Sequence, residues 1–158
     1  MKKYTLLFAI VLLFMGCGLE SKYGLPEELP TNPDLVGVWK DVDNGKGMIL
    51  ITKKSKTRYT LEVVFDLNKN DENFKFEAYD VKIGNQIILN LLQKDNNGQN
   101  INMFYTYNVK RDTLTFKEVV DNTSEIDKES ASALLNYFKN NIDKKDFFGE
   151  SIRMVRLK

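Results

Sequence analysis

Residues 100–119 have the sequence NINMFYTYNVKRDTLTFKEV, in which apolar and polar side chains largely alternate. Because successive side chains of a strand point to opposite faces, the runs 100–110 and 113–119 each predict a strand with one buried face. Arg111-Asp112 leaves room only for a tight turn between them, so the two strands are expected to be antiparallel neighbours. The face expected to be buried carries Ile101, Met103, Tyr105, Tyr107, Val109, Leu114 and Phe116.

The same pattern recurs upstream, with Asn, Asp and Gly between the apolar runs. Seven consecutive strands are predicted, at 36–41, 47–53, 57–66, 74–83, 86–93, 100–110 and 113–119. Between 74 and 83 the apolar positions change parity after Phe76, onto Tyr79, Val81 and Ile83. This change predicts a β-bulge or a bend in that strand.

One α-helix is predicted at about 128–142, followed by a last strand from Ser151 to Leu157. The helix is expected to begin at Asp127 or Ser130, and its apolar residues recur every three or four positions. The fold class is therefore mainly β. Eight strands with short connections predict an antiparallel up-and-down sheet, and closure into a barrel would remove its exposed edges.

The first predicted strand opens with Leu35-Val36-Gly37-Val38-Trp39. This Gly-x-Trp resembles the start of lipocalin-like (calycin-type) barrels. The resemblance implies that Gly37 permits close packing, that Trp39 plugs one end, and that an arginine near the end of the chain packs across the tryptophan. Arg153 or Arg156 fits that role, and Arg156 fits better because it shares a face with Ile152 and Met154.

The N-terminus has the layout of an export signal, with Lys2 and Lys3, an apolar run from Leu6 to Met15, and Gly16 before Cys17. The run is too short for a membrane-spanning helix, which needs about twenty residues. Residues 13–17 resemble the lipobox of bacterial lipoproteins. The resemblance implies cleavage before Cys17, lipid attachment to that cysteine, and anchorage in the bacterial cell envelope at the outer membrane, on either face. A plain secretory signal followed by a free thiol is the alternative.

Three segments follow from these patterns. Residues 1–16 are predicted to be the signal peptide, and residues 17–33 the lipidated cysteine and a flexible tether. The tether prediction rests on Pro26, Pro30 and Pro33, all the prolines of the chain. Residues 34–158 are predicted to form the barrel domain.

Composition excludes several function classes. The chain has 23 basic residues, 22 acidic residues, no histidine and one cysteine. A Ser-His-Asp triad, a Cys-His nucleophile, a zinc site of nitrogen and sulfur ligands, and a disulfide are therefore impossible within the chain. The balanced charge gives no reason to expect nucleic acid. No carboxylate stands alone among apolar residues, so we expect no enzymatic activity, and no cofactor.

Residues 66–71 with Glu77 have the oxygen-rich spacing of a calcium loop. However, Asp71 replaces the glycine that the sharp turn requires, and strands rather than helices are predicted on both sides. A solvated hairpin turn is the preferred interpretation, and no metal site is predicted.

The side chains expected on the inner faces of the strands are compatible with two functions. Six residues are candidates for lining a cavity that holds a small apolar or amphipathic ligand: Tyr59, Leu61, Phe65, Met103, Tyr105 and Tyr107. Alternatively, these large side chains fill the barrel, and the protein acts through its surface on another envelope protein.

Overall fold

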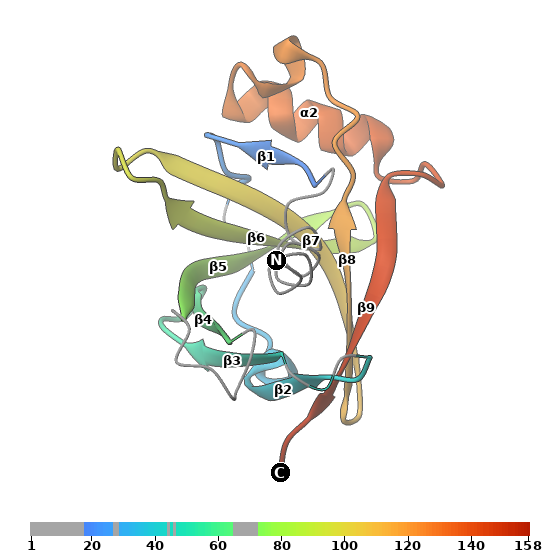
Figure 1. Cartoon of the computed structure of the whole chain (residues 1–158). Coiled ribbons are helices and arrows are strands. Elements are labelled where there is room, and N and C mark those ends of the chain that lie inside the picture. Colours follow the sequence, from blue (N-terminus) through green and yellow to red (C-terminus); the bar gives the residue numbers. More distant parts are fainter. Residues whose placement is uncertain (1–17, 27–28, 44, 46, 65–72) are drawn as a thin grey trace, which may run out of the picture.

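The fold is mainly β (Figure 1). The computed structural model describes residues 18–158 except 27–28, 44, 46 and 65–72, and the structural statements below concern these residues. Its strands are β1 (Glu20–Ser21), β2 (Gly37–Asp41), β3 (Met48–Lys53), β4 (Tyr59–Val64), β5 (Phe74–Ile83), β6 (Gln86–Lys94), β7 (Asn100–Lys110), β8 (Thr113–Val119) and β9 (Phe148–Arg156). The helices are the 3-10 turns η1 (Pro33–Leu35) and η2 (Glu125–Lys128) and the α-helix α2 (Ala131–Asn141).

Strands β2 to β9 form a closed antiparallel barrel. Each strand pairs with the next along the chain, and β9 pairs back with β2 through Trp39 and Arg156. The predicted eight-stranded up-and-down barrel, with one α-helix before the last strand, is therefore confirmed. Strand β9 begins at Phe148, three residues before the predicted start, and α2 is shorter than predicted because Glu125–Lys128 forms a separate 3-10 turn.

A first core fills the inner face of the barrel. Every second residue of each strand points inward, so the inner core draws on all eight strands. Its buried members are Leu35, Trp39, Ile49, Ile51, Tyr59, Leu61, Val63, Ala78, Leu89, Leu91, Tyr105, Leu114, Phe116 and Met154.

A second core lies outside the barrel wall, beneath α2 and the N-terminal segment (Figure 1). Helix α2 begins where the Ser130 hydroxyl accepts the N–H of Ala133 at 3.1 Å. It then buries Leu134, Tyr137 and Phe138 against the outer faces of the strands. Strand β5 is thus buried on both faces, since Tyr79, Val81 and Ile83 belong to this outer core while Ala78 belongs to the inner one.

This burial on both faces explains the change of parity that predicted a β-bulge or a bend in residues 74–83. Strand β5 pairs with β4 and with β6 in unbroken register, so the change of parity after Phe76 is not a bulge. It marks the place where the outer layer begins to cover the strand. The described ladders have their register shift between β8 and β9 instead, between Lys117 and Val119.

The tether prediction is wrong for Gly18–Pro26. Gly18 forms a β-bridge with Val120, and β1 pairs with β7. Leu19 and Leu25 are 1% and 3% exposed in the outer core. The sequence pattern missed this segment because its two buried leucines lie six residues apart, which matches neither a strand nor a helix.

Candidate functional site in the barrel interior

The structure brings most of the predicted lining residues together. Tyr59, Leu61 and Tyr105 are buried in the inner core, and Met103 and Tyr107 pack against it while remaining partly accessible. Phe65, the sixth candidate, lies outside the described residues. These five residues form an apolar part of the wall that carries the hydroxyls of Tyr59, Tyr105 and Tyr107.

Trp39 and Arg156 pack against each other where β2 pairs with β9. The Arg156 guanidinium lies 4.2 Å from the centre of the Trp39 ring, an arrangement in which cation and ring attract each other. It also donates hydrogen bonds to the backbone oxygens of Val36 (2.7 Å) and Asp34 (2.6 Å). The indole N–H of Trp39 donates to the oxygen of Leu35 at 2.9 Å, so the tryptophan is held on both sides.

Gly37 makes this close packing possible. Its backbone has a φ of 150°, and a Cβ at this position would overlap Nη1 of Arg156. The structure thus contains the glycine, tryptophan and arginine contacts that the lipocalin resemblance implies, with Arg156 rather than the exposed Arg153 in the arginine role.

A buried carboxyl lies on the inner face of β5. Asp80 is 2% exposed and shares the inward parity of Phe76 and Ala78. Its Oδ2 accepts hydrogen bonds from the hydroxyls of Tyr59 (2.6 Å) and Tyr107 (2.9 Å), while Oδ1 is buried without a hydrogen-bond partner. This carboxyl contradicts the expectation that no acidic residue stands among apolar ones.

The electrostatics of this cluster follow from burial. Removal from water raises the pKa of Asp80, and the two phenol hydrogen bonds oppose that rise. Burial also raises the pKa of Tyr59 and of Tyr107, and the neighbouring Asp80 raises both further. Both phenols therefore remain protonated donors. We refer to Asp80, Tyr59 and Tyr107 as the interior polar cluster.

Sequence reasoning missed Asp80 because the supposed bulge placed it on the outer face. The signal that identifies it is parity, since Asp80 falls in step with Phe76 and Ala78 when no bulge is assumed. The predicted turn at 66–71 and the calcium alternative lie outside the described residues. Glu77, the last position of that pattern, pairs with Lys54 and lies 3.6 Å from Arg58.

Two features are absent from the described residues. No group of three or more histidine, cysteine or acidic side chains in this part of the chain is placed to hold a metal ion. None of the helices described is long and apolar enough to cross a bilayer.

The barrel, its late helix and the Trp39–Arg156 contact are consistent with a calycin-like fold. Comparison of the chain with protein-family models, with curated proteins and with solved structures finds no match.

Proposed function

We propose that this protein is a lipid-anchored, non-catalytic component of the bacterial cell envelope whose barrel binds a small apolar or amphipathic molecule. The anchor is supported by the signal-like segment before Cys17, which lies with that cysteine outside the described residues. Two or three acyl chains on one cysteine would give lasting attachment, because each buried methylene contributes about 0.8 kcal/mol.

The observation that carries the binding function is the composition of the inner wall. Small-molecule sites are lined mainly by apolar side chains with a few convergent polar groups. The interior polar cluster supplies such polar groups within an otherwise apolar wall. In this cluster, Oδ1 of Asp80 is a hydrogen-bond acceptor without a partner. A titratable group with a pKa shifted by burial in a concave apolar site is also typical of functional sites.

Accessible surface on the inner stripe of β7 supports the same function. Met103, Tyr107 and Val109 pack against the inner core from every second position of this strand, yet each remains partly accessible.

Native mass spectrometry tests the proposal on the chain from Gly18 onward, which contains both cores and every described strand. Purified without detergent from a bacterial host, it should carry a reproducible extra mass that organic extraction removes. Met103→Trp adds bulk to the inner face and should lose the extra mass, whereas Thr106→Trp, on the outer face of the same strand, should keep it. A clean mass that stays unchanged after incubation with fatty acids and lipids would exclude the carrier function.

A protein-binding surface is the second candidate, and one apolar patch favours it. Val42, Val155 and Leu157 are 38%, 39% and 43% exposed; Val155 lies in β9, and Val42 and Leu157 directly follow the paired strands β2 and β9. Substitution of Val155 by Asp would disrupt a partner contact there while leaving the interior unchanged, so ligand retention by this variant separates the two functions.

A further inference from the structure

Helix α2 and the N-terminal segment cover one side of the outer barrel wall. Their apolar side chains pack on β5, β6 and β7, whereas β2 and β3 lie on the opposite side of the barrel (Figure 1). On that side, the residues that alternate with inner-core side chains such as Trp39 and Ile49 point outward. Six apolar residues, which we call the apolar face, occupy outward positions of β2, β3 and β9 or directly follow these strands: Val38, Val42, Met48, Leu50, Val155 and Leu157.

The apolar face is accessible and continuous. Half of its residues are exposed, the other half are partly accessible, and none of the six belongs to either core. Val38 pairs directly with Leu50 across β2 and β3, and the backbone N–H of Leu157 donates to the oxygen of Val38. Side chains at directly paired positions lie about 5 Å apart, so these residues form one surface. Contiguous apolar surface of this kind is typical of an interaction site.

Positive charge lies within and beside the apolar face. Lys40 pairs with Val155 on one side and with Met48 on the other, so neither of its paired neighbours supplies a counter-charge. The exposed Arg153 adjoins the face, because its backbone oxygen accepts the N–H of Val42. An anionic group that reaches this surface therefore meets two cations among apolar side chains.

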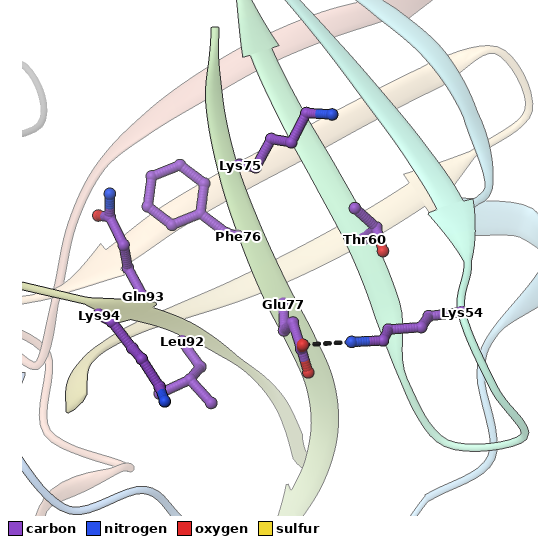
Figure 2. A pocket seen from close by; sticks show the side chains of 8 residues that line it. All are labelled: Lys54, Thr60, Lys75, Phe76, Glu77, Leu92, Gln93 and Lys94. Carbon is purple, nitrogen blue, oxygen red and sulfur yellow. Dashed lines mark hydrogen bonds and ion pairs between the residues drawn. The ribbon is translucent and has the colours of Figure 1, made fainter. Parts of the chain in front are cut away.

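The carboxylates at the border of the face already have basic partners. Glu62, which pairs directly with Leu50, lies 3.1 Å from Lys75. Glu77, two residues along β5 from Lys75, bonds to Lys54 (Figure 2). The groove in the same view has a volume of about 350 Å³ and is lined by three lysines and one carboxylate. Basic groups thus outnumber carboxylates from the face to the groove.

We propose that the apolar face binds an acidic segment of another cell-envelope protein. Apolar side chains of that segment cover Val38 and Leu50, and its carboxylates pair with Lys40 and Arg153. The assignment rests on the second candidate function, the protein-binding surface, and names the chemistry of the partner. It does not depend on a ligand inside the barrel.

The charge of the face disfavours a second copy of this chain as the occupant. Two copies in face-to-face contact bring two sets of Lys40 and Arg153 into one interface, whereas Glu62 is already paired with Lys75. Like charges that face each other disfavour association. A partner that supplies carboxylates has no such repulsion.

The N-terminal segment lies on the side of the barrel opposite the apolar face (Figure 1). Leu19 is buried in the outer core, and Gly18 forms a bridge with Val120, directly after β8. The proposed lipid on Cys17 would therefore hold the outer-core side of the barrel at the membrane. The apolar face then points toward other proteins of the envelope rather than toward that bilayer.

Photocrosslinking in the bacterium that encodes the chain tests the proposal on the full-length protein. A photoreactive p-benzoylphenylalanine replaces Leu50 or, in a second variant, Val155, and Asn136, an exposed residue of α2, is the control position. We expect one protein partner to be captured from both face positions and not from Asn136. Mass spectrometry of the crosslinked partner peptide should find Asp or Glu beside apolar residues.

Charge reversal tests the acidic character of the partner. Lys40→Glu/Arg153→Glu should lower the crosslinking yield at Leu50 about tenfold, because each new carboxylate faces an acidic group. Lys139→Glu/Lys144→Glu, which makes the same charge change on α2 and the turn after it, should leave the yield unchanged. Urea unfolding shows whether both double variants keep the fold. Lys40→Gln/Arg153→Gln removes the charge without reversing it, should give a smaller loss, and decides the test if the reversal variant does not fold.

Equal yields in the two charge-reversal variants, or a partner peptide without acidic residues, would overturn the acidic partner and leave a protein-binding surface standing. Capture of a second copy of this chain, or of lipid, would overturn the assignment in favour of a dimer or a membrane contact. No capture from either face position would overturn the second candidate function together with the acidic partner, and would leave the ligand-binding function untouched.

Discussion

The hydroxyl of Tyr59 donates a hydrogen bond of 2.6 Å to Oδ2 of Asp80, and the backbone explains this direction. The oxygen of Tyr59 already accepts the N–H of Asn32, so its own proton is directed to the carboxyl. Asn32 stands immediately before η1, in which the backbone oxygen of Asp34 accepts a hydrogen bond from Arg156. The interior polar cluster thus joins β4, β5 and β7 to the segment that leads into the barrel.

The buried carboxyl predicts a specific pH dependence of stability. Because burial raises the pKa of Asp80 in the folded state, the protonated carboxyl is favoured by folding. The protonated carboxyl contributes fully to the free energy of unfolding at pH values below the pKa that Asp80 has in the unfolded chain. This contribution is lost as the pH rises through the pKa that Asp80 has in the folded protein. Asp80→Asn keeps an oxygen for both phenols and removes the charge, so its stability relative to the wild type should increase with pH.

Urea unfolding of both proteins at several pH values between about 4 and 8 measures this difference, a range that begins near the ordinary Asp pKa. Glu77→Gln is the control, because this exposed carboxyl has a pKa lowered by Lys54 and should show the opposite trend. Parallel stability curves for wild type and Asp80→Asn would show that the Asp80 carboxyl does not change its protonation on folding.

The contact between Trp39 and Arg156 predicts that arginine and lysine are not equivalent at position 156. Arg156→Lys keeps the charge but loses the planar contact with Trp39 and the paired hydrogen bonds to Val36 and Asp34. We expect a loss of about 2 kcal/mol in the free energy of unfolding. Arg153→Lys, on an exposed position of the same strand, should change it by less than about 0.5 kcal/mol. Equal effects at both positions would mean that the Trp39 contact contributes little.

Strand order and turn positions were predictable because they follow from local periodicity and turn chemistry. In 100–119 the period of two and the Arg111-Asp112 turn specify both strands and their pairing. The Trp39–Arg156 contact was predictable only through a resemblance, because the two residues are far apart in sequence. The interior position of Asp80 was not predicted, since a strand that is buried on both faces loses the alternation of apolar and polar residues that marks its inner face.

The packing of Gly18–Pro26 depends on polar partners that look like surface residues in the sequence. Asn90 and Asn102 are buried on the outer face of β6 and β7, where they satisfy the backbone of this segment. The Leu25 N–H donates to Oδ1 of Asn90 at 2.9 Å, and Nδ2 of Asn102 donates to the oxygen of Ser21 at 3.2 Å. Asparagines on a strand normally indicate a solvated face, and here they indicate a covered one.

The proposed lipid anchor predicts incorporation of labelled palmitate at one residue. When the full chain is expressed in a bacterial host with labelled palmitate, the protein should carry the label and sediment with membranes. Cys17→Ser removes the only thiol and should abolish both properties. Wild-type protein without label would support the alternative of a plain secretory signal followed by a free thiol.

Substitutions of the buried leucines in residues 18–26 should lower the free energy of unfolding, whereas substitutions in a flexible tether would not. Leu19→Ala and Leu25→Ala each empty a buried site in the outer core, and each should cost about 2–5 kcal/mol in unfolding free energy. Leu157→Ala, at a residue that is 43% exposed, is the matched control and should cost less than about 0.5 kcal/mol. Urea unfolding of the chain from Gly18 onward measures all three variants. If the first two behave like the control, the segment detaches in solution and Cys17 is joined to the barrel by a flexible linker. If they show the expected loss, the residue next to Cys17 is fixed at Val120, and a lipid on that cysteine holds the α2 side of the barrel at the membrane surface.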